Sequence, residues 1–167
     1  MKIQEIMTRQ VEACKPKTDL AAVSMTMWRR DCGIVPVIDD TRRVLGVVTD
    51  RDICMALATR HRRAEELTAQ DVMGDRFYSV GPDDEVRVAL ETMRTRRVRR
   101  LPVVDVERRL QGIVSINDLV LHAHPSGARA TPGISANDVL TTFQGICGHP
   151  LPAARPQEKE PLVAAHA

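Results

Sequence analysis

Aromatic side chains are scarce in this chain of 167 residues, at only 2% of the composition. The complete set is Trp28, Phe77, Tyr78 and Phe143. A protein that stacks successive nucleic-acid bases on an aromatic platform needs several such side chains close together, and a lectin that stacks sugars has the same requirement. The scarcity therefore excludes both classes and predicts a core built from aliphatic residues.

Long apolar runs and a strong excess of one charge are also missing. The formal net charge is +2, and the apolar stretches are short and interrupted by charges, well below the roughly 20 residues of a membrane span. The first residues lack the apolar run of a signal peptide. We therefore expect a soluble, cytoplasmic protein with no membrane partner, in which any basic function is local.

Cysteines are few and scattered, at positions 14, 32, 54 and 147, with no Cys-x-x-Cys spacing. This pattern predicts reduced thiols and no metal site. The pairs His122 with His124 and Cys147 with His149 are interpreted as incidental, because neither has a second matched pair. No nucleophile motif and no pair of acids suited to acid–base chemistry is recognisable, so we expect no enzyme activity.

An internal repeat organises the chain. Residues 3–57 align with residues 69–123 at an offset of 66 without a gap, and apolar positions match apolar positions almost throughout. Identical pairs include Met7 with Met73, Pro16 with Pro82, Pro36 with Pro102, Gly46 with Gly112, and Asp52 with Asp118. The chain is thus two copies of one unit, predicted as residues 1–62 and 63–124.

Within each unit the strands are predicted from short aliphatic runs. In the first unit these runs cover residues 34–38 and 44–48, and a polar connection between them indicates an antiparallel pair. The copies cover residues 101–104 and 110–114. An extended segment over residues 10–14 adds a further strand before the first helix.

Two helices complete each unit. Helical spacing of apolar residues follows Asp19, and Gly33 suits a left-handed end for this helix. A second helix is predicted to start at Thr49 or Asp50, with its copy at Ser115. The resulting β-α-β-β-α unit is an α+β, sandwich-like arrangement. Because one unit buries only a thin core, we expect the two to pack face to face with pseudo-two-fold symmetry.

The composition changes after residue 124. Residues 125–149 are predicted to form a partly ordered tail with a short helix near 136–146, which Ser135 can cap. Residues 150–167 are predicted to be disordered.

The corner between the second strand and the second helix carries the candidate chemistry. A glycine, a hydroxyl residue and an aspartate recur there, as Gly46, Thr49 and Asp52 and again as Gly112, Ser115 and Asp118. A hydroxyl residue followed three residues later by an acid is typical of a capping box. The usual acid or amide at that position is Glu or Gln, and the Asp side chain is shorter than either. The same helix start can bind phosphate, and the carboxylate can accept both hydroxyls of a ribose. Because the same pattern occurs at equivalent positions of both repeats, a ligand-binding role is favoured over capping alone.

The sequence resembles a tandem pair of CBS domains, a Bateman module, of the stand-alone bacterial type over residues 3–123. In the first unit the motifs are Ile6-Met7-Thr8, Gly33 to Asp39 and Gly46 to Ile53. In the second they are Val72-Met73, Leu101 to Asp105 and Gly112 to Leu119. The resemblance implies two such repeats and a regulatory, signal-transducing module that binds AMP, ADP, ATP, NAD or another adenosyl ligand in two clefts between them.

The resemblance also implies roles for individual residues. The ribose would be held by Asp52 and Asp118. The phosphates would lie near Thr49, Ser115, Arg51, Arg99 and Arg100. Adenine would be enclosed by Cys32, Gly33, Ile34, Val47, Val98 and Ile113, with Cys32, Gly33 and Ile34 serving the cleft of Asp118. It further implies a homodimer formed through the CBS helices and an unidentified effector protein. A ligand-independent structural or stress-related CBS protein is the alternative.

A run of arginines makes the two clefts unequal. Its members are Arg94, Arg96, Arg97, Arg99 and Arg100. We expect the cleft of Thr49 and Asp52 to take the more phosphate-rich ligand, because the other cleft has Asn117 in place of Arg51. Three interpretations of the run stay open: a solvated helix end, contact with nucleotide phosphate, and contact with a nucleic-acid backbone. Nucleic acid is the least favoured partner.

Overall fold

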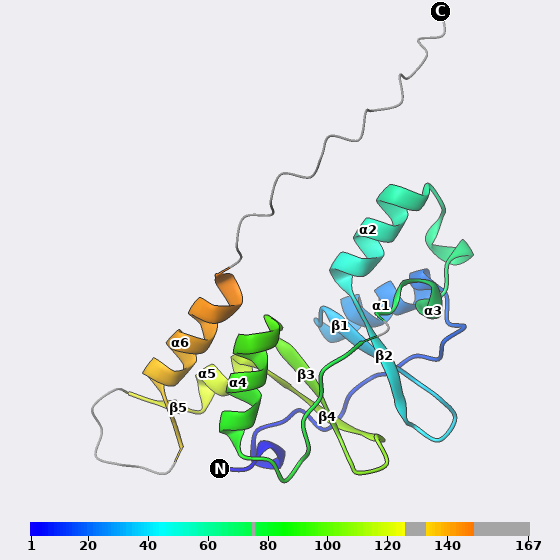
Figure 1. Ribbon diagram of the computed structural model, residues 1–167. Coiled ribbons are helices and arrows are strands. Elements are labelled where there is room, and N and C mark those ends of the chain that lie inside the picture. Colours follow the sequence, from blue (N-terminus) through cyan, green and yellow to red (C-terminus); the bar gives the residue numbers. More distant parts are fainter. Residues whose placement is uncertain (75, 126–132, 149–167) are drawn as a thin grey trace, which may run out of the picture.

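The computed structural model describes residues 1–74, 76–125 and 133–148, in which both repeats have the same order of elements (Figure 1). In the first repeat they are α1 (Leu20–Arg30), β1 (Ile34–Ile38), β2 (Val44–Thr49) and α2 (Asp50–Arg60). In the second they are α4 (Val86–Arg96), β3 (Arg100–Val104), β4 (Leu110–Ser115) and α5 (Ile116–Leu121). Short helical turns precede them at η1 (Ile3–Glu5), η2 (Ala64–Glu66) and α3 (Ala69–Val72). Each pair of strands is antiparallel, and the predicted α+β class is confirmed.

A third segment extends each hairpin, but only by one residue. Cys14 pairs in parallel with β1, and Val80 makes the equivalent pairing with β3. The strand predicted over residues 10–14 is therefore wrong except at Cys14. The physical reason is that Thr8 pairs with Ile113 of β4, so the chain after Thr8 has to cross from the second hairpin to the first.

The first helix of each repeat ends in a left-handed residue that is not glycine. Asp31 ends α1 with a φ of 48°, and Arg97 ends α4 with a φ of 56°. The prediction that Gly33 provides the left-handed end is wrong. Aspartate is one of the side chains that enters this region most readily. Gly33 instead lies against the Asp50 side chain, since a Cβ atom there would be 2.7 Å from Oδ2 of Asp50, which would have to shift.

The two hydrophobic cores exchange their N-terminal segments. Ile3 and Ile6 are buried in the core of the second repeat, whereas Leu67 and Ala69 are buried in the core of the first. The exchange is also bonded, since the amide of Leu20 donates to the carbonyl of Leu67 at 2.9 Å. Burying one such aliphatic side chain contributes about 1.5–3 kcal/mol. Each core is therefore completed by residues from the other half of the chain, which locks the repeats together.

A pseudo-two-fold axis runs between the two hairpins. The amide of Val44 donates to the carbonyl of Arg108, and the amide of Leu110 donates to the carbonyl of Arg42, both at 3.0 Å. The two bonds are related by the repeat offset of 66. A small apolar cluster surrounds them, formed by Ile38, Val44, Val104 and Leu110. The predicted face-to-face packing with pseudo-two-fold symmetry is thus confirmed.

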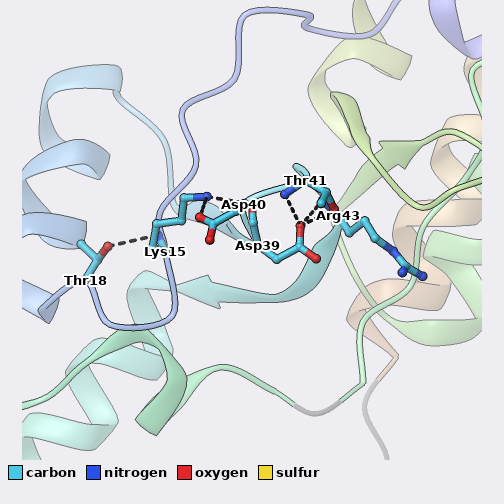
Figure 2. A network of polar contacts seen from close by, with 6 residues as sticks. All are labelled: Lys15, Thr18, Asp39, Asp40, Thr41 and Arg43. Atoms are coloured by element: carbon cyan, nitrogen blue, oxygen red, sulfur yellow. Dashed lines mark hydrogen bonds and ion pairs between the residues drawn. The ribbon is translucent and has the colours of Figure 1, made fainter.

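The turn that joins β1 to β2 is fixed by a polar network (Figure 2). Oδ1 of Asp39 accepts the backbone amides of Thr41 and Arg43, each at 2.9 Å, and the Thr41 hydroxyl at 2.8 Å. These bonds, led by that of the hydroxyl, lower the pKa of Asp39. Nζ of Lys15 donates to the Asp39 carbonyl and to Asp40, at 2.8 and 2.9 Å. The turn is thereby held where the two hairpins meet.

A further helix, α6 (Ala136–Cys147), covers the outer face of the second repeat, where residues 136–146 were predicted to be helical (Figure 1). It follows a two-residue parallel pair, β5 (Ala123–His124) with β6 (Ile134–Ser135). Val139 and Ile146 belong to the core cluster of that repeat. Gly145 of α6 lies against the Arg94 side chain. Nη1 of Arg87 forms an ion pair with Oδ1 of Asp138 at 3.6 Å. The predicted disordered segment 150–167 is outside the described residues.

The corresponding face of the first repeat is open within the described residues. A groove of about 910 Å³ runs between α1 and α2. Its wall includes Met27, Trp28, Ile53 and Leu57, and the Trp28 side chain is 84% exposed. Trp28 corresponds to Arg94, the residue that α6 covers in the second repeat. The outer faces of the repeats are therefore unlike.

Candidate functional site

Two clefts are formed jointly by the two repeats, and most of their wall positions correspond at the offset of 66. The first cleft lies beside Thr49 and has a volume of about 470 Å³. The second cleft lies beside Ser115 and has a volume of about 320 Å³. Both volumes fall within the range of roughly 300–1,000 Å³ that is usual for small-molecule sites.

The structure brings most of the predicted site residues to these clefts. The first cleft is lined by Val47, Thr49, Arg51, Val98, Arg99 and Arg100, together with Gly33 and Ile34. The second is lined by Cys32, Ile34, Arg100, Ile113, Ser115 and Asp118. Gly33 was expected on the second cleft but lies on the wall of the first. Asp52, predicted to hold the ribose, is half-buried and is not among the residues that line the first cleft.

At the first cleft, the start of α2 is a closed capping box. Oδ2 of Asp52 accepts the Thr49 amide at 2.8 Å and the Thr49 hydroxyl at 2.6 Å, while the Asp52 amide donates to that hydroxyl oxygen at 3.2 Å. The short aspartate side chain does reach its partner, contrary to the expectation from its length. Among the described residues, Oδ1 of Asp52 accepts no hydrogen bond, which leaves one carboxylate oxygen for another donor.

The same box recurs three times elsewhere. Ser115 and Asp118 form it at the second cleft, where Oδ2 of Asp118 accepts the Ser115 hydroxyl at 2.6 Å and the Ser115 amide at 2.7 Å. Thr68 with Asp71 and Ser135 with Asp138 form it away from both clefts. Capping alone therefore explains the spacing of hydroxyl and acid. What sets the Thr49 and Ser115 corners apart is that each stands at the wall of a cleft.

One wall of each cleft was not foreseen from the sequence. The segment that crosses between the hairpins supplies Gln10, Val11 and Glu12 to the second cleft, and its copy supplies Arg76, Phe77 and Tyr78 to the first. The guanidinium of Arg96 lies over the Tyr78 ring at 4.8 Å, and that of Arg108 over the Phe77 ring at 5.1 Å. Two of the four aromatic residues thus gather at one cleft, and no regular pattern in the sequence of this segment indicated that they would.

The charges on the two walls differ sharply. The first cleft is lined by one acid, Asp50, and by Arg51, Arg76, Arg97, Arg99 and Arg100. None of these arginines has an acidic partner within 4 Å among the described residues. The second cleft is lined by Glu12, Asp31 and Asp118 against Arg30 and Arg100, and Arg30 is paired with Glu12. The first cleft is strongly cationic and the second is nearly balanced.

The arginine run does not form one exposed stripe. Arg94 is bonded to Glu91 at 2.8–3.0 Å and lies beneath α6, while Arg96 stacks on an aromatic ring. Arg97, Arg99 and Arg100 instead line the first cleft. The run is therefore divided between packing and the cleft, an arrangement that favours an enclosed anion over an extended polyanion.

The described residues contain no group of three or more His, Cys, Asp and Glu side chains arranged to hold a metal ion. His122 bonds through Nδ1 to the Asp118 carbonyl at 2.8 Å, and His149 lies outside the described residues. Burial raises the pKa of the Cys14 thiol to about 11, so this thiol stays protonated at neutral pH. No helix in the described ranges has both the length and the apolar character needed to cross a bilayer.

The sequence model of the CBS domain matches residues 3–59 and 69–124. This chain therefore belongs to the CBS domain family and contains a pair of these domains. A CBS domain-containing protein of Bacillus subtilis, YhcV, is 29% identical over 140 residues, which cover 82% of this chain and 97% of the relative. An uncharacterised 17.7 kDa protein of Acidianus ambivalens is 36% identical over 120 residues, covering 71% of this chain and 70% of that protein.

Solved structures of CBS domain proteins have the same fold. A CBS domain protein from Pyrobaculum aerophilum, complexed with AMP, has a TM-score of 0.65 and 25% sequence identity; the match covers 71% of this chain and 90% of that chain. The family thus includes a protein with an adenine nucleotide bound to the fold found here. Together with the paired clefts, this supports a regulatory ligand-binding module.

Proposed function

We propose that this chain is a regulatory sensor of adenine nucleotides, with AMP, ADP, ATP or NAD as its ligand. The observation that carries the proposal is the first cleft, whose unpaired arginines surround the start of α2. Guanidinium groups bind phosphate oxygens in pairs of parallel hydrogen bonds. The start of α2 adds the positive end of a helix dipole at the same place, although the amides of Arg51 and Asp52 already donate to Asp50 and Thr49. The relative from Pyrobaculum, solved with AMP, supports the adenine part of the ligand.

Each ligand would lie with its ribose at the corner and its base between the repeats. Asp52 and Asp118 accept the ribose hydroxyls, using the carboxylate oxygen that the cap leaves free. Thr49 and Ser115 lie near the phosphate. The base is enclosed by aliphatic walls, formed by Val47, Ile34 and Val98 in the first cleft and by Ile113, Ile34 and Cys32 in the second. An adenine can be held in this way without an aromatic platform.

The two clefts would take different ligands. The first, with its five arginines, suits ATP or another polyphosphate. The second suits a ligand with fewer phosphates, because Asn117 replaces Arg51 and three carboxylates line its wall. Ligand binding alters the relative orientation of the repeats, and an effector protein responds to that change. No catalytic step is part of this function, and a cytoplasmic location is consistent with it.

The first experiment is to release and identify any co-purified ligand. The purified protein is denatured, and the supernatant is analysed by nucleotide chromatography and mass spectrometry. We expect adenine nucleotide near stoichiometric amount, or a thermal shift when AMP, ATP or NAD is added to the empty protein. An empty protein without any shift would contradict the proposal and favour the ligand-independent structural role.

We further propose that the protein forms a homodimer through the open groove of the first repeat. Because α6 covers the equivalent face of the second repeat, α1 and α2 offer the free helical surface, with Trp28 exposed on it. We expect Trp28→Ala to shift a dimer to monomer in analytical ultracentrifugation, while Leu121→Ala, an exposed residue of α5, leaves it unchanged. A wild-type monomer, or a dimer that persists in Trp28→Ala, would contradict this assignment.

A further inference from the structure

Arg100 stands at the boundary that the two clefts share. It is the first residue of β3, and its backbone lies opposite Ser115 of the second cleft. Its side chain extends to the first repeat, where Nη1 lies 3.5 Å from the position that a Cβ atom would take on Gly33, beside the carboxylate of Asp50. Arg100 consequently lines both clefts. The Arg100 guanidinium thus lies beside the backbone of Gly33.

The pseudo-two-fold axis places one residue from each repeat at this boundary. The position equivalent to Arg100 is Ile34, which also lines both clefts. Only one of the two shared positions can therefore contribute a charge. A single guanidinium is therefore shared by the two clefts.

The two clefts depend on that guanidinium to different degrees. In the first cleft, four other arginines line the wall and have no acidic partner within 4 Å among the described residues. In the second cleft the other arginine, Arg30, is held by Glu12. Phosphate in the second cleft therefore relies on Arg100, whereas phosphate in the first has alternatives.

We propose that Arg100 couples the two clefts negatively, so that a polyphosphate in the first cleft weakens phosphate binding in the second. A guanidinium that binds the phosphates of one ligand in a bidentate manner is withdrawn from the other. By linkage, a phosphorylated ligand in the second cleft weakens the first to the same extent. This inference rests on the proposed function, and it deepens it by making the two sites interdependent.

The test compares two ligands of the second cleft that differ only in their phosphate. AMP and adenosine are each titrated calorimetrically into wild-type protein, with and without saturating ATP. Asp118→Ala identifies the titration that belongs to the second cleft. We expect ATP to weaken AMP binding about fivefold or more, within the usual range of coupling, and to leave adenosine binding unchanged. In Arg100→Ile, which makes both shared positions isoleucine, the ATP effect on AMP should vanish, whereas Arg29→Ala, an exposed residue that lines neither cleft, should retain it.

Three results would overturn the coupling. They are AMP binding that ATP does not change, coupling that persists in Arg100→Ile, and an equal weakening of AMP and adenosine, which marks simple competition for one cleft. Failure of the proposed function has a different signature, because no nucleotide then binds to either cleft.

Discussion

The two repeats are most alike where they pack against each other and least alike in their clefts and on their outer faces. Their hairpins share the same register, and their cores exchange equivalent N-terminal segments. Their clefts, by contrast, differ in charge at corresponding positions, the first being strongly cationic and the second nearly balanced. The comparison shows that packing constrains residue type at the shared interface, whereas a few surface residues are enough to give each cleft its own chemistry.

The outer faces of the repeats differ as well. In the second repeat, α6 packs on α4 and α5, and Arg94 lies beneath Gly145. In the first repeat the equivalent position is the exposed Trp28. One repeat is thus covered by the chain itself, while the described residues leave a groove open on the other. Within the described part of the chain, the duplicated fold therefore has two unequal clefts and one uncovered helical face.

The largest expected effect is on the free energy of unfolding, and it tests whether the two exchanged segments contribute equally to the two cores. Leu67→Ala should lower the free energy of unfolding by about 2–5 kcal/mol, because it leaves a cavity in a packed core. Ile3→Ala should have a comparable cost in the other core, since both side chains are fully buried. Urea denaturation measures both, with the exposed Val106→Ala as control. If Leu67→Ala is as mild as the control, the exchanged segments do not contribute to the cores.

The next effect tests the contrast between the clefts. The double variant Arg97→Ala with Arg99→Ala should weaken ATP binding at the first cleft by about 100-fold, since each charge-assisted hydrogen bond contributes roughly 1.5–3 kcal/mol. Adenosine binding should change much less. Calorimetry measures both ligands, and Arg29→Ala, at an exposed position of α1, is the matched control. Equal losses for ATP and adenosine would indicate damage to the fold instead of loss of phosphate contacts.

The next prediction has a smaller expected effect and concerns a substitution that makes the second cleft resemble the first. Asn117→Arg places an arginine where the first cleft has Arg51. We expect AMP to bind about tenfold more tightly there, from one added charge-assisted contact. Asn117→Gln supplies the control for a longer side chain without charge. An arginine variant that binds AMP no better than the glutamine variant would show that position 117 does not face the phosphate.

The smallest effect concerns α6, which distinguishes the outer faces. Hydrogen bonds from the backbone and hydroxyl of Ser135 lower the pKa of Asp138. The ionised carboxylate therefore stabilises the start of α6 above its ordinary pKa of about 3.8, and this stabilisation is lost as the pH falls through the lowered value. The protection of the α6 amides, measured as exchange relative to the intrinsic rate of an unstructured chain at the same pH, should accordingly fall at acid pH. In Asp138→Asn this extra pH dependence should disappear, and its persistence would contradict the role of Asp138.

Much of the fold follows from local pattern. The repeat, the aliphatic strand runs and the hydroxyl-to-acid corners predicted both hairpins and the positions of Thr49 and Ser115. The exchange of segments was not predictable, because Ile3 and Leu67 are ordinary apolar residues locally and only the tertiary packing decides which core they enter. The end of α1 was misplaced because aspartate can adopt the left-handed conformation that favours glycine.

The clefts were predicted only in part for a similar reason. The walls near Val47 and Ile113 follow strands whose periodicity is visible in the sequence. The walls formed by Tyr78 and Glu12 come from segments with no regular pattern, which cross between the hairpins. Their place depends on the pairing of Thr8 with β4, a contact between residues far apart in the chain.

The central claim is that the two clefts are unequal nucleotide sites, and titration of ATP into two cleft variants tests it most directly. Asp71→Ala is the matched control, because it removes the same capping acid from a corner outside the clefts. We predict that wild-type protein and Asp71→Ala bind ATP at one tight site, that Asp52→Ala loses this site, and that Asp118→Ala keeps it. Equal losses of ATP affinity in Asp52→Ala and Asp118→Ala would contradict the claim.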